Sequence, residues 1–397
     1  MTATPKTATI PSWSQLSRHE VMPEVSHDEI ARFNLLAQIN IYLSSQLLPS
    51  VKTSYEKRTK PRFIAEHGRE PATRQEIRKA MLDDSAYQVW SALRRNTMEQ
   101  RQQAGRAVVY RQLDSLNDTA KKLNAGKPTL QLDPSVVSPR YATAVDIHCM
   151  PGSYHTEVCN DDVSAAANYD VGIFVTTAGM LGSYSDGGGQ AIARWLQVNR
   201  PDFKPRRILD IGCSIGHNIV PLALAFPDAE VIAVDVAAPM LRYAHARAQS
   251  MGATNLNFRQ ANGEALDYPD DHFDLITTAM FWHETSSVAL PRILGEIYRL
   301  LSPGGLTLHL EQPQYAGMGL YEQFIRDCDT YNNNEPFWTV MHDLDLKAII
   351  KNAGFDLDKY FETTMAALVD RSIFPQAGEG SEDYGRTAAW TAFGASK

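Results

Sequence analysis

The hydrophobic positions in the first part of the chain follow the period of an α-helix. From Ser26 onward, apolar side chains recur every three or four residues, and Ser26 with Glu29 has the pattern of a capping box. Pro49 is expected to end this first helix, because proline lacks a backbone donor. Helical spacing returns between residues 73 and 123. Residues 1–125 are therefore predicted to form an all-helical accessory domain, acting as a lid or a dimerisation unit.

Turn-forming residues mark the next part of the chain. Residues 126–140 contain three prolines and no helical period, which is typical of a linker. The three glycines at 187–189 predict a second flexible point. Residues 126–190 are therefore interpreted as a linker together with a segment that covers the substrate and cofactor.

Beyond Arg206, short β-branched runs alternate with amphipathic segments. This alternation predicts a doubly wound, Rossmann-like α/β domain over residues 191–397. The two last predicted strands have no helix between them, which indicates an antiparallel edge hairpin and completes a seven-stranded sheet. The predicted strands are 208–211, 230–234, 256–260, 273–280, 306–311, 355–363 and 387–393.

Composition limits the partners that the chain is expected to bind. The net charge of its 397 residues is −8, and no run of Lys or Arg is long enough to follow a phosphate backbone, so no nucleic-acid partner is expected. The four cysteines form no C-x-x-C pair, so neither a disulfide framework nor a zinc site is indicated. The sequence shows no signal-peptide pattern and no apolar run of about 20 residues, so we expect a cytoplasmic protein without a membrane partner.

A ligand site is expected where the strand from Ile208 ends. Small residues at this turn, including Gly212 and Gly216, allow the backbone to approach a ligand at a helix N-terminus. Asp235 stands about 20 residues further on, where an α/β nucleotide-binding domain places an acid that accepts the ribose hydroxyls. A purely structural turn and a helix cap remain the alternatives for these two features.

Five segments in this order resemble the class I methyltransferases that use S-adenosylmethionine (SAM), especially the small-molecule branch related to the ubiquinone and menaquinone enzymes. The segments are 210–216, Asp235, 261–266, 273–276 and 300–305. The resemblance covers roughly residues 169–361. It implies that SAM is the cofactor, with its methionine part at the first segment, its ribose at Asp235 and its adenine beside the third. The residues it implies for SAM binding are Tyr169, Asp210, Gly212, Cys213, Ser214, Gly216, Asp235, Val236, Met240, Asn262, Gly263 and Ala279.

The candidate catalytic residues follow directly after the predicted fourth strand. His283 is the candidate general base, because an unperturbed pKa near 6.5 suits proton removal at neutral pH. Glu284 is expected to orient it or to cap the following helix, and a packing role for His283 remains open. His148, Cys149 and His155 are conceivable metal ligands, but no fourth ligand stands at a fitting spacing, so we expect a covering loop and no metal.

The sequence therefore predicts an enzyme that transfers a methyl group from SAM to a small-molecule O-, N- or C-nucleophile, in secondary or specialised metabolism. Tyr315, Tyr321 and Trp338 favour an aromatic or apolar acceptor. Two alternatives remain: a SAM-fold protein with an interaction role or another reaction, and a protein or RNA methyltransferase. A homodimer through the N-terminal helices is also expected.

Overall fold

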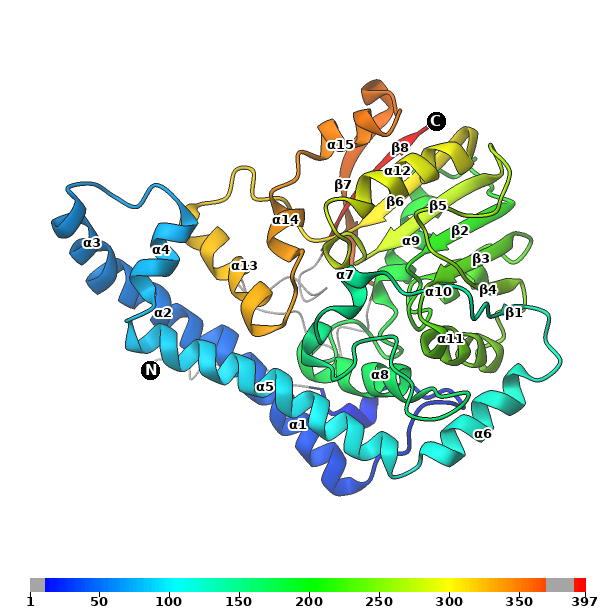
Figure 1. Cartoon of the computed structure of the whole chain (residues 1–397), viewed down its shortest axis with the longest axis horizontal. Coiled ribbons are helices and arrows are strands. Elements are labelled where there is room, and N and C mark those ends of the chain that lie inside the picture. Colours follow the sequence, from blue (N-terminus) through cyan, green and yellow to red (C-terminus); the bar gives the residue numbers. More distant parts are fainter. Residues whose placement is uncertain (1–10, 369–388) are drawn as a thin grey trace, which may run out of the picture.

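One mixed β-sheet forms the centre of the protein (Figure 1). The computed structural model describes residues 11–368 and 389–397. In the described residues the strand order is β1-β4-β3-β2-β5-β6-β8-β7, and β8 alone runs in the direction opposite to the other strands. The strands are β1 (Leu130–Gln131), β2 (Arg207–Ile211), β3 (Glu230–Asp235), β4 (Leu256–Gln260), β5 (Phe273–Ala279), β6 (Leu301–Leu310), β7 (Tyr360–Ala366) and β8 (Ala389–Ser396).

The predicted doubly wound α/β fold with an antiparallel edge hairpin is confirmed. The described part of the chain has eight strands, however, and not seven. The additional strand is β1, which lies within the stretch predicted to be a linker and pairs Leu130 with Phe258 of β4. A two-residue strand has no room for a period-two pattern, so the sequence offered no sign of it.

Helices cover both faces of the sheet. The cluster of buried side chains on one face includes residues of α9, α10 and α11, and the cluster on the other face includes residues of α12 and α15. The remaining helices of this half lie near the carboxyl ends of the strands or beyond β6. The bounds of all the helices in this half are α7 (Arg140–Thr143), α8 (Ser164–Thr177), α9 (Gly187–Asn199), α10 (Ile219–Ala225), α11 (Ala238–Ser250), α12 (Ala289–Leu300), α13 (Leu320–Asn332), α14 (Trp338–His342) and α15 (Leu346–Asn352).

The first part of the chain is helical, as predicted. Residues 27–110 form an arm that extends away from the sheet, whereas residues 113–124 pack against α11 (Figure 1). Pro49 does not end the first helix, so that prediction was wrong. Two π-helical segments, Leu43–Leu47 and Tyr55–Thr59, each precede a helical segment with proline at its second position. A wide turn displaces the carbonyl that the proline ring would otherwise meet, so the helix continues. The α-helices are α1 (His27–Tyr42), α2 (Leu48–Ser54), α3 (Lys60–His67), α4 (Arg74–Met81), α5 (Ser85–Tyr110) and α6 (Leu113–Asn124).

The helix α8 joins the arm to the sheet domain. It contacts α1, α5 and α11, and nearly all of its side chains are buried. Trp13 Nε1 donates to the carbonyl of Val171 at 3.0 Å, and Arg101 Nε donates to that of Gly172 at 2.9 Å. Residues of α5, α8 and α11 belong to one hydrophobic cluster, so the two halves share a core. The domain boundaries at residues 125 and 190 remain a prediction.

A buried ion pair joins the arm to α13. Arg94 of α5 lies 3.1 Å from Asp329, and both side chains are almost completely buried. Nearby, Arg74 of α4 pairs with Asp327 at 2.8 Å. The arm is thus anchored both at α8 and at the segment that follows β6.

The glycines at 187–189 do not form a flexible point. They are the buried first turn of α9. A Cβ at Gly189 would lie 2.3 Å from the carbonyl oxygen of Asn218, and one at Gly188 would lie 2.7 Å from its Oδ1. The glycines therefore serve close packing of α9 against the start of α10. Among the described helices, none is long and apolar enough to cross a membrane.

Candidate active site

A cavity of about 230 Å³ lies at the carboxyl ends of the parallel strands. Its walls come from the ends of β2, β3 and β5, from the loop after β4, and from α5, α7, α8, α14 and β8. Crevices at the carboxyl ends of parallel strands are the usual ligand sites of open α/β sheets. Twelve of the fourteen predicted site residues line it, namely Tyr169, Gly212, Cys213, Ser214, Asp235, Val236, Met240, Asn262, Gly263, Ala279, His283 and Glu284.

The turn after β2 forms one end of the cavity. Gly212 has φ +76°, and a Cβ there would lie 2.2 Å from the ring of Phe281, so only glycine fits. Ser214 also has positive φ, and its N–H donates to Oδ2 of Asp235 at 2.9 Å. Its hydroxyl is buried and has no hydrogen-bond partner within the described residues. A buried polar atom without a partner at this turn fits a polar ligand.

Asp235 ends β3 and faces the cavity. Its Oδ1 accepts the N–H of Ala237 at 2.9 Å, and its Oδ2 accepts that of Ser214. A carboxylate has about four lone-pair sites, so two remain for a ligand. Burial raises the pKa of Asp235, and its backbone hydrogen bonds oppose that shift. On the loop after β4, Oδ1 of Asn262 accepts the N–H of Glu264, which leaves its amide nitrogen to donate.

These residues fit SAM. The turn offers small residues and a buried hydroxyl, Asp235 has free acceptor sites for two ribose hydroxyls, and Asn262 has a donor for the purine edge. Asp210 and Gly216, by contrast, do not line the cavity. Asp210 is buried and accepts a hydrogen bond from Thr277 at 2.6 Å, and burial raises its pKa to about 7. Their role in holding the methionine part stays a prediction.

His283 is held by Glu311, which follows β6. Its Nδ1 lies 2.8 Å from Oε1 of Glu311, and both side chains are buried. Burial lowers the pKa of His283, but the charge of Glu311 and the hydrogen bond outweigh it and raise the pKa to about 9. This direction does not favour the base role, because a protonated imidazole cannot accept a proton. Glu284, the expected orienting partner, points to a different imidazole. A role for His283 as base stays a prediction.

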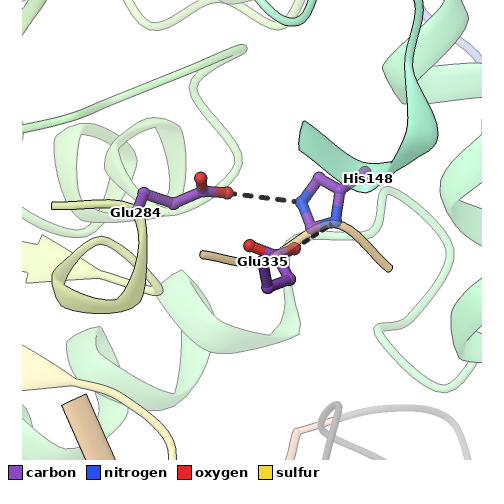
Figure 2. Close-up of side chains that lie close together, drawn as sticks. All are labelled: His148, Glu284 and Glu335. Carbon is purple, nitrogen blue, oxygen red and sulfur yellow. Dashed lines mark ion pairs between the residues drawn. The ribbon is translucent and has the colours of Figure 1, made fainter. Parts of the chain in front are cut away.

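That other imidazole belongs to His148, and Figure 2 shows the carboxylates of Glu284 and Glu335 directed toward it. His148 Nδ1 lies 2.6 Å from Glu335, and its Nε2 lies 3.4 Å from Glu284. Burial lowers the pKa of His148, but the two carboxylates raise it to about 10. The other proposed partners do not join it: Cys149 donates to the carbonyl of Asn332, and His155 lines the cavity separately.

A second buried network supports the cavity wall behind Tyr169. The carboxylate of Asp170 lies 2.9 Å from Nε2 of His19 and 3.3 Å from Nε2 of His217, and it accepts the hydroxyl of Tyr243 at 2.7 Å. Burial raises the pKa of Asp170, but the two histidine hydrogen bonds hold it well below its usual range. This network fixes α8 against the segment before α1 and against α11.

Sequence reasoning missed Glu311, Glu335 and Arg101 at the site. A signal for Glu311 was present, since it ends the predicted strand 306–311, whose carboxyl end lies beside that of the strand before His283. Nothing in the sequence pointed to Glu335 or Arg101, because Glu335, in the loop after α13, is brought beside His148 and Arg101, on α5, is brought to the cavity only by tertiary packing.

Residues 208–305 match the family model described as a methyltransferase domain. A demethylmenaquinone methyltransferase of Thermus thermophilus is 38% identical over 109 residues, covering 28% of this chain and 48% of that protein. A ubiquinone/menaquinone biosynthesis C-methyltransferase of Edwardsiella ictaluri is 28% identical over 177 residues, covering 40% of this chain and 70% of that protein. The predicted resemblance to class I SAM-dependent methyltransferases is confirmed.

The chain spans about half the length of several curated relatives that it matches, including an uncharacterized methyltransferase of Bacillus subtilis, which is 31% identical over 39% of this chain and 51% of its own. Among solved structures, Haemonchus contortus phosphoethanolamine N-methyltransferase 2 in complex with S-adenosyl-L-methionine is similar at 17% identity. That likeness covers 54% of this chain and 57% of the other, with a TM-score of 0.34.

Proposed function

We propose that this chain is an enzyme that transfers a methyl group from SAM to a small-molecule acceptor. The observation that carries the proposal is a single cavity with two kinds of wall. One wall consists of the SAM-type segments after β2, β3 and β4, and the other consists of aromatic and ionisable side chains. The second wall includes Tyr141, Tyr154, Tyr169, Phe281, His283 and Trp338. The names of the curated relatives support the same reaction.

The residues of the second wall suit alignment of an acceptor. Bound SAM would supply an electrophilic methyl group on a sulfonium. The chain then has to hold the nucleophile in line with that group and, for an acidic acceptor, to handle its proton. Glu311 fixes the imidazole of His283 through Nδ1, so Nε2 is the ring atom left to contact an acceptor. The aromatic side chains favour a flat or apolar acceptor.

The arm contributes to this wall, which supports a covering role for residues 1–125. Arg101 of α5 lines the cavity, and its Nε is held by the carbonyl of Gly172. A homodimer through the arm is the second part of the proposal. Leu35 on α1 and the pair Val89 and Leu93 on α5 are exposed apolar side chains that support it. Light scattering on the parent and on a Leu35→Lys, Val89→Lys variant measures the oligomeric state directly. A parent protein with the mass of a monomer, equal to that of the variant, would refute the dimer.

The reaction is tested in two steps on the purified protein. Calorimetry with SAM should show binding, and no heat at millimolar SAM would refute the proposal. Fractions of a small-molecule extract are then added with SAM, and we expect S-adenosylhomocysteine together with a product that has gained one methyl group by mass spectrometry. Binding of SAM without formation of S-adenosylhomocysteine in any fraction would favour the alternative of a SAM-fold protein with another role.

A further inference from the structure

The cluster of His148, Glu284 and Glu335 has the composition of a metal site. One ligand atom from each residue lies within 4.8 Å of the others. The three residues come from distant parts of the chain: the turn before α8, the turn after β5, and the loop after α13. A mixed imidazole and carboxylate set suits divalent transition metals such as Zn²⁺ and Mn²⁺.

The cluster also carries carboxylate oxygens that lack a partner. Glu335 is fully buried, and its Oε2 has no hydrogen-bond partner among residues 11–368 and 389–397. Oε2 of Glu284 is likewise without a partner in the described chain, since Tyr154 donates to Oε1. A buried carboxylate oxygen without a donor is costly, and a cation removes that cost.

The distance between two of the candidate ligands fits one ion. Two ligands at metal distances of about 2.0–2.2 Å and tetrahedral angles lie roughly 3.3–3.6 Å apart. His148 Nε2 and Glu284 Oε1 are 3.4 Å apart. Oε1 of Glu335 lies 2.6 Å from the other ring nitrogen, Nδ1, so Glu335 becomes the third ligand when its side chain rotates away from Nδ1 toward the ion.

We propose that His148, Glu284 and Glu335 bind one divalent transition-metal ion at the acceptor side of the cavity. Three protein ligands leave open coordination positions. These positions face the cavity, because His148 and Glu284 line it. An oxygen or nitrogen atom of the acceptor is held there, opposite the segments that fit SAM. The site thus selects acceptors that carry a metal-binding group.

The test uses the full chain after dialysis against a chelator. Calorimetry with ZnCl₂ and MnCl₂ should give one ion per chain, whereas MgCl₂, which prefers oxygen ligands alone, should bind more weakly. Glu335→Gln and Glu284→Gln keep the side-chain size and should each weaken binding by roughly 10–100-fold or more. Glu66→Gln, on the exposed face of α3, is the matched control and should bind as the parent does.

Melting curves by circular dichroism show whether each variant folds, and if Glu335→Gln does not fold, Glu284→Gln carries the test. Loss of the visible Co²⁺ absorption in His148→Ala would identify the imidazole ligand. No binding of Zn²⁺ or Mn²⁺ below millimolar concentration, or equal affinity in the parent and both glutamine variants, would show that the cluster is an internal ion pair only. No SAM is present in these titrations, so their outcome is independent of the proposed reaction.

Discussion

Substitution of Asp235 by alanine should weaken SAM binding by a predictable amount. The carboxylate already accepts two backbone N–H groups, from Ser214 and Ala237, and its two remaining lone-pair sites are those available to the ribose. Hydrogen bonds to a charged group contribute about 1.5–3 kcal/mol. Loss of that interaction corresponds to a roughly 10- to 150-fold higher Kd, since a change of about 1.4 kcal/mol in the binding free energy changes Kd tenfold.

Calorimetry with SAM and with S-adenosylhomocysteine measures this change. Asp235→Asn is the milder variant, because it keeps the size of the side chain and one acceptor for the backbone, and should fall between the parent and Asp235→Ala. Asp228→Ala, at an exposed position just before β3, is the matched control and should bind like the parent. Equal affinity of Asp235→Ala and the parent, with matching melting curves, would refute the placement of the ribose at this carboxylate.

Three further predictions concern the base candidate, the arm and the buried histidine of β6. As the candidate base, His283→Ala should lower kcat by roughly 10²–10⁴-fold with little change in SAM affinity, as steady-state rates with the identified acceptor will show. Because Glu311 raises the pKa of His283 to about 9, the rate of the parent should rise with pH up to about 9, and Glu311→Gln should move that rise to lower pH. Arg94→Ala should lower the free energy of unfolding by roughly 3–5 kcal/mol in urea titrations, because Asp329 keeps a buried charge, and an unchanged midpoint would contradict this. Burial lowers the pKa of His309 to about 3, so its contribution to stability is present above pH 6.5 and is lost as the pH falls toward 3. The loss at pH 5 should be about 2 kcal/mol relative to pH 7.5, and His309→Gln should remove that part of the slope.

The fold was predictable where local patterns are strong. The β-branched runs from Ile208 onward and the helical spacing before residue 125 identified most elements. The predictions failed at proline and glycine, because the effect of these residues on the backbone depends on the segments that surround them in the folded chain. Pro49 is accommodated by the π turn before it, and the glycines at 187–189 are required by the backbone of Asn218 and not by flexibility. Such contacts exist only in the folded chain.

The sequence likewise predicted one half of the candidate site better than the other. Most of the predicted SAM half follows one stretch of sequence with fixed spacing, and ten of its twelve predicted residues line the cavity. The acceptor half combines His148, Glu284 and Glu335, which are separated by more than a hundred residues or by whole helices. The sequence near His148 offers Cys149 and His155 as further candidate ligands, whereas the partners of its imidazole, Glu284 and Glu335, come from other elements.

The position of β8 between β6 and β7 has a consequence for the order of events during synthesis. The ribosome synthesises the chain from its N-terminus, so β7 leaves the ribosome before β8. Because β7 pairs with β8, it cannot join the sheet until β8 has paired with β6. Trp390, on β8, is also the last cavity-lining residue to emerge. Every shorter nascent chain therefore lacks part of the cavity wall. A cofactor that binds only the finished cavity cannot stabilise these intermediates, so the arm and sheet must assemble through their shared core alone.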